Sequence, residues 1–496
     1  MAAAFAAVAV FHWATAIGAD APVLYGEGAV AHAALLARRG AEYAPSVDPR
    51  VFNAANYPPL YLRLAGAGDP FVAGRMVSVG CTLLVAGAIA HRARAAGALV
   101  ALALAAAFVA TAPVALWGPA VKPDLLALAL TVAAVVALDR AYCRGTEGIV
   151  SGTANKRMRP WAAASRVGAE RARAGALSEG LAGPRSSSAG SWRPAAVAGA
   201  LFALAILAKP TAALPAGALL AWVAVRAGRA AAAGAVVGGV AAATAAALLL
   251  PELRPPASAW LHVVSWNALP WSASSAVSLI LVAALTTGVA VAVALIRGPA
   301  RGAVDAYLAA AIGIVLLGGR EGATINYILD LAAASLLAIA SIAPALRTRP
   351  WYPLAAAAQL LVGIAVLNPF GLLPGPPPTT GAWSDPSRVG IIRALPSGTV
   401  LIEDSGLAIA TGREPTVDDL FLWSQLVKRG SIDPGPLLDA TSQGAFVAVV
   451  SQADLERLDA APAFERARWD AALVEAVIAR YKLDASTRGL YVYVPR

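Results

Sequence analysis

The sequence predicts a mainly α-helical protein, in which a polytopic bundle of about eleven membrane-spanning helices precedes a small α/β domain. Three observations predict this fold class. Hydrophobic residues make up 59% of the 496 residues and charged residues only 14%, whereas soluble domains are about one quarter charged. The apolar residues gather into long runs separated by short polar segments. From about Pro369 onward the composition becomes mixed. A bilayer is therefore the solvent that suits most of this chain.

The apolar runs define the predicted membrane helices. Several runs are shorter than the ~20 residues that cross a 30 Å hydrocarbon core, and short helices tilt or thin the bilayer. We interpret the run that begins at Met1 as a membrane helix rather than a cleaved signal segment. The stretch 195–226 is interrupted by Lys209-Pro210, and we interpret it as two helices. The predicted spans are 1–18, 71–90, 97–117, 124–140, 195–208, 211–226, 230–250, 276–296, 303–318, 326–345 and 351–368.

Arginine and lysine predict the orientation of the bundle, because positively charged loops remain in the cytoplasm. With the break at Lys209, all five basic clusters fall on one side. The segment 143–194 alone has nine Lys or Arg against three Glu, a net charge of +6. We therefore expect a cytoplasmic N-terminus, a cytoplasmic basic loop at 143–194 and an extracytoplasmic C-terminal domain. The clusters are His91–Arg94, Arg140–Arg193, Arg226–Arg229, Arg297–Arg301 and Arg347–Arg349.

Two classes of site are not expected. The net charge of +10 does not indicate nucleic-acid binding, because the positive charge sits in loops between membrane helices. Cys81, Cys143 and the four histidines show no metal-ligand spacing. We expect no dedicated metal site and no required cofactor, although dependence on a divalent cation stays open.

Candidate catalytic carboxylates lie in the first outer loop, residues 19–70. Asp20 and Glu27 are seven residues apart, so both fit one face of a short helix. Equally, both acids fit the solvated end of a membrane helix. The stretch Ala29–Arg39 is typical of an amphipathic helix lying along the interface. Tyr57 and Tyr61 flank Pro58-Pro59 and are candidate site-lining residues, or aromatic anchors on a rigid turn.

Three cations are placed where membrane helices meet the outer face. Lys122 precedes Pro123-Asp124, and Asp124 is either a second acid of the site or the favourable charge of a helix N-terminus. Lys209 lies between two apolar segments, and Arg320 lies on the outer side against the orientation rule. Asn326, which follows Arg320, is a further candidate lining residue. Carboxylates can deprotonate a hydroxyl and cations can stabilise a departing phosphate, which is the set needed for transfer from a phosphate-activated donor.

The order of these segments resembles bacterial GT-C-fold glycosyltransferases related to glycosyltransferase family 39, the protein mannosyltransferase-like and aminoarabinose-transferase-like group. The resemblance covers most of the chain outside 143–194. It is carried by Asp20, Gly26-Glu27-Gly28, Asn56–Tyr61, Lys122–Ala127, Ala208–Ala212, Gly318–Tyr327, Val400–Ala408 and Gly412–Pro415.

The resemblance implies an inverting transfer of a hexosyl or pentosyl unit from a polyprenyl-phosphate carrier to an acceptor hydroxyl at the outer face of the bacterial cytoplasmic membrane. It implies that Glu27 is the first-loop acid, with Asp20 as its companion. It also implies that the donor phosphate is held by Lys122, Lys209 and Arg320. The acceptor is a lipid, a polysaccharide or a protein. The seven-residue spacing of the two acids departs from the family, where two first-loop acids are often close together.

The whole chain is expected to divide at about residue 368 into a catalytic membrane domain, 1–368, and an extracytoplasmic α/β domain, 369–496. Leu373–Pro378 is a Pro/Gly linker. Alternating patterns predict strands near 399–402, 446–450 and 490–494, and helices near 418–428, 435–443 and 468–479. Four acids of this domain either face the acceptor or, as the simpler interpretation, are solvated loop residues. They are Glu403, Asp404, Asp418 and Asp419. Two other function classes remain: a transporter or lipid flippase, and a non-catalytic membrane scaffold.

Overall fold

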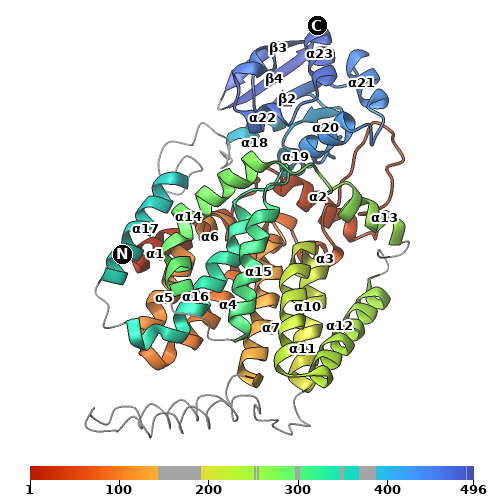
Figure 1. Cartoon of the computed structure of the whole chain (residues 1–496). Helices are drawn as coiled ribbons and strands as arrows, with labels where there is room; N and C mark the ends of the chain where they lie inside the picture. The colour runs from red at the N-terminus through yellow and green to blue at the C-terminus, as the bar shows by residue number, and fades with distance from the viewer. Residues whose placement is uncertain are drawn as a thin grey trace, which may run out of the picture.

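The computed structural model describes residues 1–142, 192–250, 253, 256–296, 302–346, 351–367, 387–487 and 489–496. A large helical body carries a smaller domain with a sheet at one end (Figure 1). Most of the predicted basic loop at 143–194, the clusters at 297–301 and 347–349, Cys143 and the linker at 373–378 lie outside the described residues.

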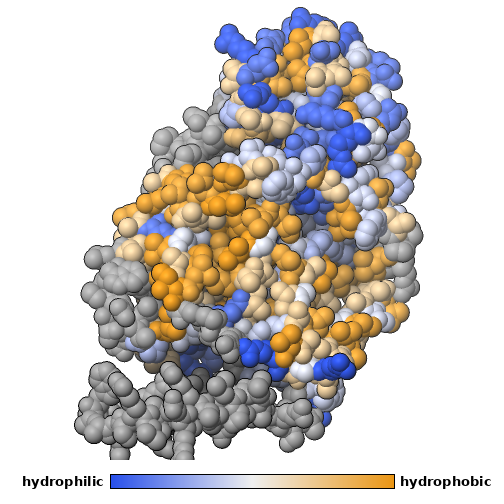
Figure 2. Space-filling model, viewed as in Figure 1, coloured by the Kyte–Doolittle hydropathy of each residue, from blue (hydrophilic) through white to orange (hydrophobic). Residues whose placement is uncertain are grey.

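The predicted fold class is confirmed: apolar helices form the body, and a small sheet belongs to the C-terminal part. Five described helices are long and apolar enough to cross a membrane, and the other apolar helices are shorter. Figure 2 shows that hydrophobic residues cover the visible face of the helical body, as a lipid environment requires. The helices are α1 (Ala2–Ile17), α4 (Pro70–Ala93), α5 (Ala98–Ala110), α6 (Ala112–Trp117), α7 (Asp124–Tyr142), α10 (Trp192–Ala208), α11 (Ala213–Arg226), α12 (Arg229–Leu249), α14 (Ala273–Ile296), α15 (Ala303–Leu317), α16 (Leu329–Leu346) and α17 (Trp351–Leu367).

Proline decides where two of the apolar runs are interrupted. Lys209 is extended, with φ −151° and ψ 125°, and a short 3₁₀ turn, η2 (Pro210–Ala212), separates α10 from α11. A residue before proline disfavours the helical region, so the break predicted at Lys209 follows from local sterics. The predicted span 97–117 is also divided, because Pro113 opens α6 directly after the extended Thr111.

The first loop is more deeply buried than the sequence indicates. Its helix α2 (Glu27–Ala37) lies between the helical body and the C-terminal domain (Figure 1). The second helix of the loop, α3 (Pro59–Ala65), packs on α2 and α4. Nearly every residue of α2 is buried. The expectation of an interfacial amphipathic helix over 29–39 is therefore wrong. Alanine-rich helices have no bulky face, so close packing on several sides is open to them.

The C-terminal domain has a four-stranded sheet of order β1-β2-β4-β3. Strands β1 and β2 pair in parallel, and the other pairs are antiparallel. Strand β3 was not predicted: it is an exposed edge strand with mostly polar residues, so it has no apolar alternation. The elements are α18 (Ser387–Arg393), β1 (Val400–Ile402), α19 (Ser405–Ala410), α20 (Leu420–Lys428), α21 (Gly435–Ser442), β2 (Ala448–Ser451), η7 (Leu455–Ala460), α22 (Ala463–Arg466), α23 (Ala471–Arg480), β3 (Tyr481–Thr487) and β4 (Leu490–Pro495).

The C-terminal domain docks on the first loop through backbone contacts. Phe52 and Val417 form a parallel bridge, in which Phe52 N donates to Thr416 O at 2.9 Å. Both carboxylate oxygens of Asp418 accept from Ala54 N at 2.9 Å. At Gly28 the approach is closest, since a Cβ added there would lie 2.0 Å from the backbone nitrogen of Gly406. Helix α2 and helix α19 therefore touch backbone to backbone.

A methyl group at position 28 tests this contact. Gly28→Ala is expected to lower the thermal midpoint of the detergent-solubilised protein, because the new Cβ overlaps backbone atoms that cannot rotate away. The matched control is Gly217→Ala in α11, where a Cβ meets nothing within 4 Å and where alanine favours a helix by about 0.5–1 kcal/mol. Equal midpoints for the two variants would contradict the close packing of α2 on α19.

Asp404 makes the stability of the C-terminal domain depend on pH. This buried carboxylate accepts from Gly406 N at 3.1 Å and from Gln452 Nε2 at 3.3 Å. Burial raises its pKa from 3.8 to about 7, although Gly406 N–H and Arg468 oppose the rise. Since the folded state holds the proton more tightly than the unfolded state, this group lowers stability as pH rises from about 4 to about 7.

The variant Asp404→Asn is expected to remove that dependence. Between pH 5 and pH 8 this group should cost the wild type about 3 kcal/mol of stability, a loss that the variant does not share. The measurement is the thermal midpoint of both proteins between pH 4.5 and 8.5. Parallel curves over that range would show that Asp404 does not carry the effect.

Candidate functional site

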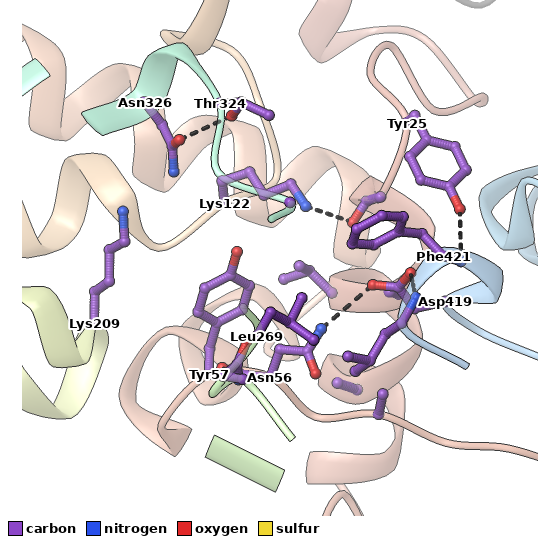
Figure 3. A pocket seen from close by; sticks show the side chains of 18 of the residues that line it. Tyr25, Asn56, Tyr57, Lys122, Lys209, Leu269, Thr324, Asn326, Asp419 and Phe421 are labelled. Atoms are coloured by element: carbon purple, nitrogen blue, oxygen red, sulfur yellow. Dashed lines mark hydrogen bonds between the residues drawn. The ribbon is translucent and has the colours of Figure 1, made fainter. Parts of the chain in front are cut away.

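A polar cavity of about 180 Å³ lies where the helical body meets the C-terminal domain. Its walls come from segments far apart in the sequence: the first loop, the loop before α7, the α10–α11 break, the segment after α15 and the start of α20 (Figure 3). All three predicted cations, Lys122, Lys209 and Arg320, line this cavity. Tyr57 and Asn326 line it as well.

Lys122 stands in the loop that precedes α7. Its Nζ donates to the carbonyl oxygen of Gly26 at 2.7 Å. Burial lowers the pKa of Lys122, and the carboxylates of Asp419, Asp124 and Glu27 oppose that shift. Among the described residues no carboxylate forms a salt bridge with this ammonium group. Lys122 is therefore a partly desolvated cation with capacity for an anionic ligand.

Lys209 is already paired. Its Nζ forms an ion pair with Asp124, which starts α7. Asn326 donates from Nδ2 to the same carboxylate oxygen at 2.7 Å. The ammonium also lies 4.8 Å from the centre of the Tyr327 ring. Asp124 does not line the main cavity, so the structure gives it the role of holding Lys209 in place.

Arg320 is oriented by two hydrogen bonds. Nη1 donates to Asn267 O at 2.7 Å and Nη2 donates to the Tyr327 hydroxyl at 2.8 Å. A guanidinium has five N–H donors in a rigid fork, which suits planar recognition of a phosphate. The backbone of Arg320 is itself held by a bridge to Trp271. The segment after α15 therefore presents a fixed cation to the cavity.

Glu27 does not occupy the position that the sequence predicts. Its carboxylate is fully buried and forms an ion pair with Arg75 at 3.0 Å. Oε2 also accepts from Val23 N, and Oε1 accepts from Val121 N, both at 2.7 Å. Glu27 is absent from the cavity lining. In this geometry Glu27 anchors the segment that leads into Lys122, and its role as the base stays a prediction.

Two further predicted residues lie away from the cavity. Asp20 is exposed and does not line it. Tyr61 is fully buried in the core, where its hydroxyl donates to Gly74 O at 3.0 Å. The motif Asn56–Tyr61 starts a helix at Pro59, so its first residues face the cavity while Tyr61 turns into the protein. The expectation that Tyr61 lines the site is wrong for that reason.

Asp419, one of the four C-terminal acids for which the sequence left an acceptor-facing and a solvated position open, lines the cavity. It caps the N-terminus of α20, with Leu422 N donating to Oδ1 at 3.0 Å, and Asn56 Nδ2 donates to Oδ2 at 3.3 Å. Burial raises the pKa of Asp419, and neighbouring Asp418 adds to the rise. Paired acids before an amphipathic helix also indicate a helix cap, and no local pattern separates the two roles.

The Glu27–Arg75 pair predicts a large loss of stability on neutralisation. Glu27→Gln leaves a buried guanidinium without its countercharge, which costs about 3–5 kcal/mol. A double-mutant cycle with Arg75→Met, measured by thermal unfolding in detergent, should show strong coupling. The matched control is Asp48→Asn, which removes the exposed pair with Arg50 and should leave the thermal midpoint almost unchanged, because water and salt screen exposed pairs. A stable Glu27→Gln protein without activity would instead restore Glu27 as the base.

Comparison with known proteins shows the fold. No protein-family model matches the sequence, and no curated protein matches it. Among solved structures, ArnT from Cupriavidus metallidurans in the apo state has a TM-score of 0.55 at 13% identity, over 99% of this chain and 96% of that chain. The same protein bound to undecaprenyl phosphate has a TM-score of 0.56 at 14% identity, over 99% and 97%. The chain therefore has the GT-C fold that its sequence motifs indicate.

Proposed function

We propose that this protein is an inverting glycosyltransferase that moves a monosaccharide from a polyprenyl-phosphate carrier to an acceptor hydroxyl. The observation that carries the proposal is the convergence of Lys122, Lys209 and Arg320 on one cavity, from three separate segments of the chain. The likeness to ArnT, which has been solved with undecaprenyl phosphate, supports it. The basic loops support an outer-face location for this cavity in a bacterial cytoplasmic membrane.

The three cations have unequal roles in this proposal. Lys209 is neutralised by Asp124, so it contributes mainly shape and a weak positive field. Lys122 and Arg320 have no carboxylate salt bridge among the described residues, so they hold the carrier phosphate. As the sugar–phosphate bond breaks, negative charge grows on the phosphate oxygen, and these two groups stabilise it.

The cavity favours an enzyme over a transporter or flippase. Its polar walls are completed by the C-terminal domain, through Asp419, Phe421 and Leu422. A transport path needs a route that alternates between the two sides of the membrane. A site completed by an extramembrane domain suits a reaction between a lipid-linked donor and an acceptor that this domain binds. The acceptor is a lipid, a polysaccharide or a protein.

The deciding experiment is sugar transfer by the purified protein in nanodiscs. We expect wild-type protein to transfer sugar from, or hydrolyse, at least one member of a panel of polyprenyl-phosphate sugars, with a membrane extract as the acceptor source. Parallel reactions with a chelator test the expectation that no metal is required. Absence of turnover for every donor, together with absence of undecaprenyl phosphate binding, would contradict the proposed function.

Removing either free cation should weaken phosphate binding. Lys122→Ala and Arg320→Ala are each expected to reduce the affinity for undecaprenyl phosphate about 10- to 100-fold, because each deletes a charge-assisted hydrogen bond worth about 1.5–3 kcal/mol. The control is Lys428→Ala, an exposed cation at the end of α20. Affinity is measured by native mass spectrometry of protein in mild detergent. Wild-type affinity in both cavity variants would place the phosphate elsewhere.

A further inference from the structure

Resting on the proposed function, we propose that Asp419, from the C-terminal domain, binds the acceptor hydroxyl and takes its proton during transfer. Asp419 lines the same cavity as the three cations. In Figure 3 its side chain points into the space bounded by Lys122, Asn56 and Tyr57. The reacting groups would then be divided between the membrane helices, which hold the donor, and the C-terminal domain, which activates the acceptor.

The other acids near the cavity are already committed or lie outside it. Glu27 is bound by Arg75 and two backbone N–H groups. Asp124 is bound by Lys209 and Asn326. Asp20 does not line the cavity. Glu321 does line it, but it is exposed to water, where a carboxylate has less reason to take up a proton.

The adjacent acid, Asp418, differs from Asp419 in the hydrogen bonds that its carboxylate oxygens accept. Both oxygens of Asp418 accept from Ala54 N, and Oδ2 lies 3.5 Å from His32 Nδ1. Asp418 is therefore bound into the interface between the first loop and the C-terminal domain. In Asp419 only Oδ1 takes part in the helix cap, where it accepts from Leu422 N at 3.0 Å. Its Oδ2 accepts one longer hydrogen bond, from Asn56 Nδ2 at 3.3 Å. Oδ2 retains capacity for a hydroxyl.

Asn56 supplies a second observation at the same place. Its Oδ1 is buried and has no hydrogen-bond partner among the described residues. Asn56 lines the cavity beside Asp419. A buried acceptor without a partner costs free energy, so a ligand donor is the natural complement. A hydroxylated acceptor supplies such donors, and Asn56 Oδ1 and Asp419 Oδ2 together form a pair of acceptor atoms for one.

The step balances within the cavity. The acceptor O–H proton moves to Asp419 Oδ2, and the acceptor oxygen bonds to the anomeric carbon from the face opposite the phosphate. The bond from that carbon to the phosphate oxygen breaks, and its electron pair stays on the carrier phosphate between Lys122 and Arg320. Burial raises the pKa of Asp419, which increases its affinity for the proton. The transfer rate should therefore rise as pH rises through that pKa, since the base must begin unprotonated.

The experiment compares three variants in the nanodisc transfer assay. Asp419→Asn removes the charge but keeps the helix cap, because asparagine caps as well as aspartate. Asp470→Asn is the matched control, a capping aspartate of α23 in the same domain that does not line the cavity. Glu321→Gln tests the other lining carboxylate. The readouts are kcat, KM for the acceptor, the pH profile, the thermal midpoint and affinity for undecaprenyl phosphate.

We expect Asp419→Asn to lower kcat about 10²- to 10⁴-fold and to lose the rising limb of the pH profile. Its affinity for undecaprenyl phosphate should be unchanged or higher, since a carboxylate near Lys122 is removed. Asp470→Asn and Glu321→Gln should retain the pH profile. The assignment of Asp419 would be overturned if the wild type transfers sugar and Asp419→Asn has a kcat within threefold of the wild-type value and the same pH profile. That outcome would leave the proposed function standing. A wild type that neither binds undecaprenyl phosphate nor uses any donor would overturn the proposed function.

Discussion

The cavity depends on one buried ion pair, Glu27 with Arg75. Glu27 binds the backbone at Val23 and Val121, while Arg75 donates to the carbonyl oxygens of Ala16, Ala19 and Ala21. The pair thereby joins the end of α1, the start of α2 and the loop before α7. Such hydrogen bonds offset the cost of burying the pair, although Arg75 Nε has no partner among the described residues. Lys122 follows Val121 directly and binds Gly26 O, so the same network sets the position of a cavity cation.

The sequence predicted the elements whose causes are local. Apolar runs indicate membrane helices, and Lys209-Pro210 marks a break because proline restricts the residue before it. The three cations were recognisable because charge is costly near a bilayer, and the structure brings them to one cavity. The edge strand β3 was not predicted, because an exposed strand needs no apolar face and therefore shows no apolar alternation.

What remained hidden depends on contacts between distant residues. The burial of Glu27 depends on its contact with Arg75, which is 48 residues away in the sequence. Asp419 meets Asn56 across 363 residues, and no local pattern predicts that the C-terminal domain turns this carboxylate toward the first loop. The burial of α2 is a further case, since small residues permit close packing without specifying the neighbour.

The charges around the cavity also add to a definite total. When all are ionised, the lining cations Lys122, Lys209 and Arg320 are matched in number by the lining acids Asp419 and Glu321 together with Asp124, which pairs with Lys209. A carrier phosphodiester brings one negative charge, and the released monoester approaches two at neutral pH. If Asp419 keeps the acceptor's proton, the charge enclosed by the protein is the same before and after transfer. The chemical step would then be insensitive to salt, and ionic strength would act on the departure of the carrier and the proton.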